Sequence, residues 1–304
     1  MFVNFTSYLI MVVFSLVGVA FLTLLERKLL GYVQLRKGPN KVGVMGLFQP
    51  FSDAVKLFTK EFFFPFKSNF NLYWVSPVVS FIVSVSVWLV FPYYFVLMGW
   101  KLGILYLFSV LSFSIYGIML SGWSSNSSYS VLGSLRVVAQ SISYEVSFFL
   151  LILCVLYFSG SMNLINLIET QCSTWYVFLV FPVFVMLFVS FLAELNRTPF
   201  DFSEGESELV SGFNIEYGGS GFAFIFLSEY LSIIFSSMII CMFFFGSGSQ
   251  FMLFYIKLLF VSLIIIIVRG TLPRYRYDKL MNMCWKSYLT VSLLMILFYL
   301  SLCF

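Results

Sequence analysis

Residues 1–25 read MFVNFTSYLIMVVFSLVGVAFLTLL and contain no charged side chain. A helix of about 20 apolar residues crosses the roughly 30 Å hydrocarbon core of a bilayer, so this run is long enough to span it. The whole chain has the same character, since 61% of its 304 residues are hydrophobic and only 10% are charged. A soluble domain has about 25% charged residues. The composition therefore excludes a soluble protein and predicts an all-α polytopic membrane protein, with one domain over residues 1–304.

Eight apolar segments of the chain are long enough to span a membrane. Their bounds are about 2–25, 72–96, 102–120, 138–158, 175–195, 222–245, 251–268 and 287–304. Because eight is an even number, we expect both termini on the same side of the membrane.

Basic side chains are distributed unevenly over the connections between these segments. Fifteen of the seventeen Lys and Arg lie in the odd-numbered connections, at about 26–71, 121–137, 196–221 and 269–286. The other face has Lys101 alone, and Lys257 lies inside the seventh segment. Since Lys and Arg mark the cytoplasmic or matrix side, we expect these four connections there and both termini on the opposite side.

Side chains that ligate redox metals are scarce in this chain. There is no His, which excludes bis-His haem and His-ligated zinc or copper. The five Cys form no Cys-x-x-Cys pair, which argues against an iron–sulfur cluster or a disulfide framework. We therefore expect no redox cofactor bound by this chain alone.

The most acidic stretch, residues 194–217, reads ELNRTPFDFSEGESELVSGFNIEY and lies between two apolar runs. It contains one base, Arg197, and six of the thirteen acids of the chain, namely Glu194, Asp201, Glu204, Glu206, Glu208 and Glu216. One interpretation is a solvated loop between two membrane helices. The other is an acidic funnel that handles protons or a ligand headgroup at the membrane surface.

Four carboxylates lie at the ends of the predicted segments or inside them, namely Glu26, Glu145, Glu194 and Glu229. An ionised acid at the centre of a spanning helix costs on the order of 2.5 to 3.5 kcal/mol, so such residues are typical of ion and proton pathways. The alternative is a static hydrogen bond between helices. Lys257 is the natural buried counter-charge, although the sequence pairs it with no particular acid.

Three further stretches combine polar and apolar residues. Arg136, Gln140 and Tyr144 recur every four residues, so they share a helical face that should meet a cavity or another helix. Residues 47–64 alternate at helical spacing and predict an amphipathic helix in the membrane interface, as an anchor or with a function of its own. The basic, Tyr-rich residues 269–286 are either an orientation signal or an Arg-lined mouth.

Four motifs together resemble one family. They are ERKLLGYVQLRKGPNKVGVMGLFQPFSDAVKLFTKE (26–61), GWSSNSSYSVLGSLRVVAQSISYEV (122–146), the acidic stretch 194–217 and RGTLPRYRYDKLMNMCWK (269–286). They are similar to the first subunit of the mitochondrial proton-pumping NADH:ubiquinone oxidoreductases, respiratory complex I. The likeness runs nearly end to end and in the same order. It implies a membrane anchor whose matrix loops form the floor and entrance of a quinone chamber.

The resemblance also implies residue roles. The chamber and its entrance would involve Glu26, Arg27, Arg36, Arg197, Asp201, Arg274 and Arg276. Proton coupling would involve Glu145, Glu194, Glu229, Glu204, Glu206 and Glu208. In the implied mechanism, quinone reduction changes the charge felt by the acidic loop, and the buried carboxylates then change protonation.

The implied substrate is ubiquinone or a rhodoquinone-like quinone, with flavin and iron–sulfur clusters in hydrophilic partner subunits. The other implied partners are antiporter-like membrane subunits and lipid, with no nucleic acid. The implied location is the mitochondrial inner membrane, with both termini on the intermembrane-space side. Two other functions stay open: the membrane anchor of an energy-converting hydrogenase, and a stand-alone proton-coupled secondary transporter.

Overall fold

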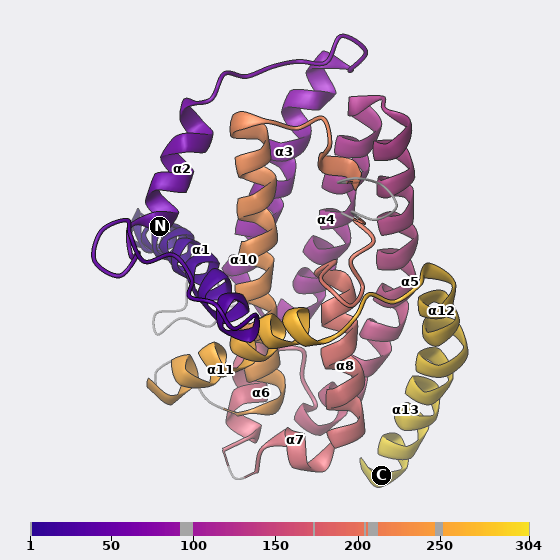
Figure 1. Ribbon diagram of the computed structural model, residues 1–304. Helices are drawn as coiled ribbons and strands as arrows, with labels where there is room; N and C mark the ends of the chain where they lie inside the picture. The colour runs from indigo at the N-terminus through magenta and orange to yellow at the C-terminus, as the bar shows by residue number, and fades with distance from the viewer. Residues whose placement is uncertain are drawn as a thin grey trace.

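The computed structural model describes residues 2–91, 100–172, 174–203, 205, 212–246 and 252–303, and these residues form helices and no strands (Figure 1). Seven helices in the described part are long and apolar enough to cross a membrane. The predicted all-α polytopic architecture is therefore confirmed. The elements are α1 (Phe2–Val33), α2 (Gln49–Thr59), α3 (Phe70–Ser86), η1 (Val87–Val90), α4 (Gly103–Ser125), α5 (Ser128–Ser159), α6 (Leu164–Thr170), α7 (Tyr176–Leu179), α8 (Phe181–Glu194), η2 (Gly212–Asn214), α10 (Gly219–Phe244), α11 (Met252–Thr271), α12 (Tyr277–Asn282), η3 (Met283–Tyr288) and α13 (Leu289–Cys303).

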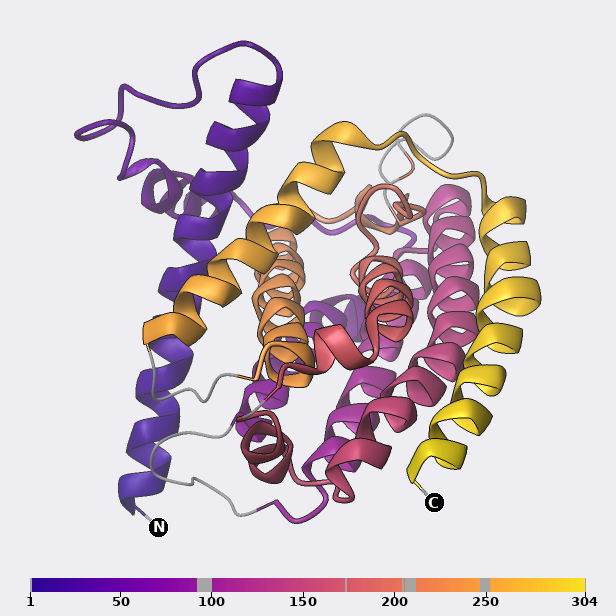
Figure 2. The ribbon, with the colours of Figure 1, turned by 90° about the horizontal axis from the view of Figure 1, so that it is seen from below.

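Helix α10 is the central helix of the bundle. Its side chains from Met238 to Phe244 have almost no exposed surface, which agrees with a helix that is apolar on every face. It packs on α1, α3 and α11, while α5 packs on α4, α8 and α13. Helices α1 and α11 lie at one edge of the molecule, and α13 lies at the opposite edge beside α5 (Figure 2).

Small residues allow these helices to approach closely. A Cβ atom added to Gly117 of α4 would lie 3.0 Å from the Cβ of Ser80 on α3, so the contact requires a glycine. Serine hydroxyls inside the bundle donate to the carbonyl three residues earlier, as Ser143 does to Gln140 and Ser147 to Tyr144. These bonds satisfy the hydroxyl groups, and the chain can therefore place many serines in an apolar bundle.

Helix α5 begins well before the predicted span. The predicted 121–137 connection is almost entirely helical, because α4 ends at Ser125 and α5 starts at Ser128. Asn126 allows this tight turn since it adopts a left-handed conformation with φ of 52°. Ser124, Ser125 and Ser130 are buried, with the Ser125 and Ser130 hydroxyls 2.6 Å apart, whereas Asn126 and Ser128 are exposed.

Three other predicted spans also have different bounds. The fifth is divided into α7 and α8, with the break at Val180, close to Pro182 in the first turn of α8. Proline has no N–H to continue a helical hydrogen-bond ladder, which explains the break. The eighth begins earlier than expected, because α12, η3 and α13 are consecutive and start at Tyr277. Helix α1 likewise continues past the expected end to Val33.

The predicted amphipathic helix is present as α2, with Pro50 in its first turn. Its apolar stripe is largely uncovered within this chain, since Val55 is 62% and Phe58 is 53% exposed. Phe51 and Phe58 nevertheless touch the bundle through edge contacts with Phe21 and Phe224. Helix α2 therefore lies against α1 and α10 and presents apolar side chains outward.

Candidate functional site

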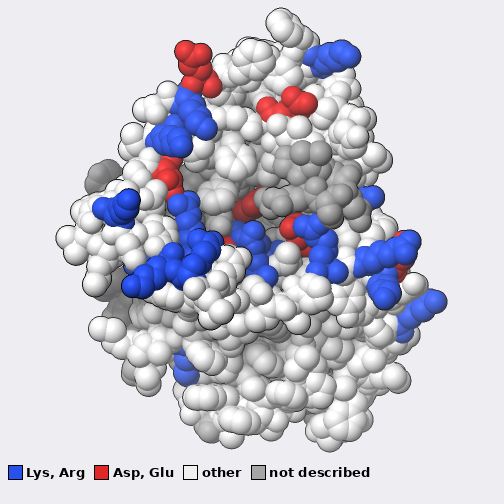
Figure 3. All heavy atoms as spheres, viewed as in Figure 1, with Lys and Arg blue, Asp and Glu red and all other residues white. Residues whose placement is uncertain are grey.

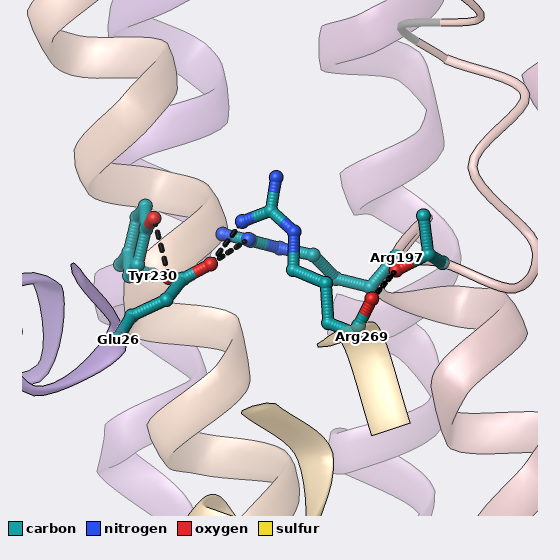
Figure 4. A network of polar contacts seen from close by, with 5 residues as sticks. Glu26, Arg197, Tyr230 and Arg269 are labelled. Carbon is teal, nitrogen blue, oxygen red and sulfur yellow. Dashed lines mark hydrogen bonds and ion pairs between the residues drawn. The ribbon is translucent and has the colours of Figure 1, made fainter. Parts of the chain in front are cut away.

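Glu26 is the centre of a buried ionic cluster that joins four parts of the chain (Figure 4). Its carboxylate, 4% exposed, accepts a hydrogen bond from Arg197 Nη1 at 3.1 Å and another from Arg269 Nη1. Tyr230 Oη donates to its second oxygen at 2.6 Å. The cluster thus ties α1 to α10, to α11 and to the segment that follows α8.

Arg197 is held in its charged form by this environment. Burial acts to lower its pKa, but the carboxylate of Glu26 opposes this most strongly, and the pKa ends above its ordinary value. The guanidinium also lies over the ring of Tyr230, 4.6 Å from the ring centroid. Because the negative charge of Glu26 offsets the effect of burial, Arg197 keeps its positive charge at any physiological pH.

A cavity of about 150 Å³ opens beside this cluster. Arg197, Tyr230 and Arg269 border it, together with Glu194, Asp201 and Glu229. Aromatic side chains form its apolar wall, among them Phe191, Phe213, Phe226 and Phe235. We call this cavity the first cavity. Figure 3 shows Lys and Arg gathered in a band across the face of the molecule seen in Figure 1, with Asp and Glu atoms set deeper between them.

A smaller cavity of about 30 Å³, the second cavity, lies next to the first. It is bordered by Glu145 and Tyr144 of α5 and shares Ser114, Glu194 and Asn196 with the first cavity. One water needs roughly 10–15 Å³ of such volume, so the second cavity has room for water. Glu194 therefore borders both cavities, with Glu229 on one side and Glu145 on the other.

Comparisons with known proteins agree on the relationship of the chain. A family model described as NADH dehydrogenase matches residues 6–300. The chain belongs to the NADH dehydrogenase family. It is 53% identical to NADH-ubiquinone oxidoreductase chain 1 of Aedes aegypti over 293 residues, which cover 96% of this chain and 94% of the relative. The protein of the same name from Locusta migratoria is 51% identical over 302 residues, covering 99% and 96%.

A more distant relative, NADH-ubiquinone oxidoreductase chain 1 of Emballonura alecto, is 45% identical over 303 residues, covering 97% of this chain and 95% of that protein. The family resemblance predicted from the four motifs is therefore confirmed. It holds over nearly the full length of this member of the NADH dehydrogenase family.

The structure of this family member brings some of the predicted site residues together. Glu26 bonds Arg197, and Arg197 and Asp201 both border the first cavity. Asp201 also pairs with Arg274 at 3.3 Å. Arg269 and Tyr230 were not among the predicted site residues, although both complete the cluster around Glu26. Arg269 stood in a motif, and Tyr230 follows Glu229, but nothing in a single sequence pairs them with a residue in α1.

Other predicted residues lie apart from the cavities. Arg27 pairs with Asp53 of α2 at 2.5 Å and fastens α2 to α1. Arg36 is exposed, and its Nε donates to Gln34 at 2.9 Å. Arg276 forms an exposed pair with Asp278 at 3.0 Å. Three predicted acids, Glu204, Glu206 and Glu208, lie outside the described residues.

Within the part of the chain that the structure describes, Lys257 is not the predicted counter-charge of a buried acid. Its Nζ donates to the carbonyl of Phe245 at 2.9 Å and lies 4.2 Å from the centroid of the Trp175 ring. The carbonyl at the end of α10 and the aromatic face together stabilise the ammonium group. Lys257 therefore fastens α11 to the end of α10 and has no part in the cavities.

The polar face of α5 meets other elements, as predicted. The Nε2 of Gln140 donates to the carbonyl groups of Ala193 and Phe200, and Tyr144 borders the second cavity. Gln140 and Tyr144 therefore face the segment that follows α8 and the second cavity, and not lipid.

Sequence reasoning also missed a tyrosine pair at the end of the acidic stretch. Tyr73 and Tyr217 stack with centroids 4.3 Å apart and an angle of 3°. The Tyr217 hydroxyl lies 2.9 Å from Ser76 Oγ and 3.0 Å from Ser124 Oγ. Burial raises the pKa of Tyr217, so the phenol stays neutral and hydrogen-bonded. Ser124 stands in the motif 122–146, but nothing in the sequence pairs it with Tyr217.

Proposed function

We propose that the chain is a core membrane subunit of a proton-pumping NADH:ubiquinone oxidoreductase in the mitochondrial inner membrane. In this function it forms part of the quinone chamber and couples quinone reduction to proton translocation. Membership of the NADH dehydrogenase family and the names of the relatives support the assignment to this enzyme. They favour it over a hydrogenase anchor or a stand-alone transporter.

One observation carries the proposal: Glu194 borders both cavities. The first cavity has a charged side around Arg197 and an aromatic side that includes Phe226, so it fits a polar ring with an apolar tail. A cavity of about 150 Å³ accepts a ring of the size of benzene. The second cavity continues from Glu194 to Glu145, and this provides the path away from the quinone.

The coupling is electrostatic. A quinone that is reduced takes up negative charge and then protons. The positive charges of Arg197 and Arg269 border the first cavity, where this change in charge takes place. Glu229 and Glu194 border the same cavity and respond by taking up or releasing protons. Glu145, which borders the second cavity together with Glu194, then changes its protonation in response. Glu204, Glu206 and Glu208, in the same acidic stretch, would add to this response.

The electrons arrive from partner subunits in this account. Flavin and iron–sulfur clusters belong to hydrophilic subunits that dock on the face carrying the basic connections. Antiporter-like membrane subunits receive the proton-coupling signal beyond Glu145. Both termini lie on the intermembrane-space side, as the distribution of Lys and Arg predicts.

Photo-crosslinking of a quinone analogue in native membranes tests the chamber role. We expect labelled peptides from the walls of the first cavity, around Phe191 and Phe226, and less label when excess quinone competes. A Phe226→Trp variant should lower the labelling because the larger ring fills the cavity. The matched change Phe298→Trp, at a 55% exposed position on α13, should leave it unchanged. Labelling confined to other polypeptides would contradict the chamber role.

A further inference from the structure

Gln140 joins both ends of the turn that follows α8. This glutamine of α5 has no exposed surface. Its Nε2 donates to the carbonyl oxygen of Ala193 at 2.7 Å and to that of Phe200 at 3.1 Å. Because both neighbours are acceptors, only the NH₂ end of the amide can face them, and the orientation of the side chain is therefore fixed.

The turn between these two carbonyl groups contains the charged residues of the site. Glu194 follows Ala193 directly and borders both cavities, and Arg197 bonds Glu26. Two further bonds join the turn to α11 and to the connection after it. Thr198 Oγ1 donates to Arg269 O, in the last turn of α11, at 3.3 Å, and Tyr275 N donates to Pro199 O at 2.9 Å.

We propose that Gln140 is a positioning residue that sets the directions of Glu194 and Arg197 by holding the backbone on both sides of them. It touches neither quinone nor the carboxylates and acts through the turn. This inference rests on the proposed function, because it assigns Gln140 to proton coupling. Without the amide, α5 no longer holds the turn by a hydrogen bond to Ala193 or Phe200, and Glu194 loses its fixed place between the cavities.

Gln171 offers a matched comparison within the chain. It is also buried, and its Nε2 donates to the carbonyl groups of Met242 and Phe243 at 3.0 and 3.2 Å. Its bonds join the end of α6 to the end of α10. Phe243 is fourteen residues beyond Glu229 on α10, about 20 Å at 1.5 Å per residue. The two glutamines thus make the same kind of bond, and only Gln140 is next to the site.

Two substitutions of Gln140 distinguish a role in positioning the turn from a role in packing alone. In Q140L the side chain can donate no hydrogen bond at any pH. In Q140E a protonated carboxyl group can donate to one carbonyl, whereas an ionised one repels both. Burial disfavours the ionised form of a carboxyl group, so acidic pH favours the form that can donate a hydrogen bond. The pH profile of Q140E therefore reports whether the bond to the turn matters.

The measurement is the number of protons pumped per NADH oxidised by the assembled enzyme in proteoliposomes, from about pH 6.5 to about pH 8.5. We expect Q140E to approach wild type at the acidic end and to fall toward the alkaline end, where the hydrogen bond to the turn is lost. One hydrogen bond is worth about fivefold in the equilibrium between the held and the released turn. Q140L should be low throughout. Q171E and Q171L should follow the wild-type profile wherever they assemble.

Wild type and Q140L provide the baseline for other titrating groups on the elements packed against this position. They include Glu194 on α8 and Cys284 and Tyr288 on η3, together with Arg136, Tyr144 and Glu145 on α5 itself and Arg197 and Asp201 in and beside the turn. A Q140E profile parallel to that of wild type or of Q140L would overturn the proposal. Failure of both variants to assemble would overturn it too, because Gln140 would then serve folding. Normal pumping by a Glu194→Gln variant would instead contradict the proposed function itself.

Discussion

Glu26 shows what a single residue reveals in the sequence and what it does not. An acid at the end of an apolar run is conspicuous. Its importance could be predicted from the free energy that an ionised acid costs inside a membrane. Its partners could not be predicted, because Arg197 is 171 residues away and Arg269 is 243 residues away. Only the packing of α1 against α10 and α11 brings them together. The same limit hid the bonds of Gln140 to the turn.

A Glu26→Gln substitution tests the ionic cluster. It leaves Arg197, whose side chain is only 11% exposed, without its main compensating charge. Breaking a buried pair in this way costs about 3–5 kcal/mol, so we expect a clear loss of thermal stability in the purified enzyme.

The matched control for this substitution is Asp278→Asn, which breaks the Arg276–Asp278 pair. Both side chains of that pair are more than half exposed, at 78% and 64%. An exposed pair contributes about 0–1 kcal/mol, so the control should melt close to wild type. Equal melting of the two variants would show that the Glu26 cluster does not stabilise the bundle.

At the scale of elements, hydropathy predicted the spanning helices wherever their residues are apolar. It failed to predict the first part of α5, where small polar residues are buried. Ser130, Gly133 and Ser134 of α5 indicate a loop, yet they are buried in the bundle. A Cβ atom at Gly133 would lie 3.1 Å from the Cα of Gly212, so this part of α5 supports the end of the acidic stretch. Hydropathy could not show that contact, because a helix buried by protein can be polar.

A Tyr217→Phe substitution tests how the end of the acidic stretch is anchored on α3 and α4. The change keeps the stack with Tyr73 but removes the hydroxyl that Ser76 and Ser124 contact. Leaving buried hydrogen-bonding groups unpaired costs about 1–3 kcal/mol, which should lower the melting temperature of the enzyme. Tyr116→Phe, at a 52% exposed position, is the control and should melt like wild type.

At the scale of the whole molecule, the sequence predicted the membrane bundle and the family, and the structure adds two cavities that share Glu194 as a lining residue. The sequence placed the four carboxylates in separate segments, and the family resemblance alone implied a chain of carboxylates that includes Glu145, Glu194 and Glu229. The structure places Glu229 at the first cavity, Glu145 at the second and Glu194 at both. That order could not be read from the chain, because it depends on how α4, α5, α8 and α10 pack together.

The most direct test of the account is the proton stoichiometry of the assembled enzyme with Glu194→Gln, alongside Glu145→Gln and Glu229→Gln. Glutamine keeps the shape of the side chain but cannot exchange a proton. The control is Glu169→Gln, an exposed acid on α6 outside both cavities. We predict that the three cavity variants pump fewer protons per NADH oxidised or lose coupled activity, with Glu194→Gln affected most, while the control pumps normally. Normal turnover and stoichiometry in Glu194→Gln would contradict the account.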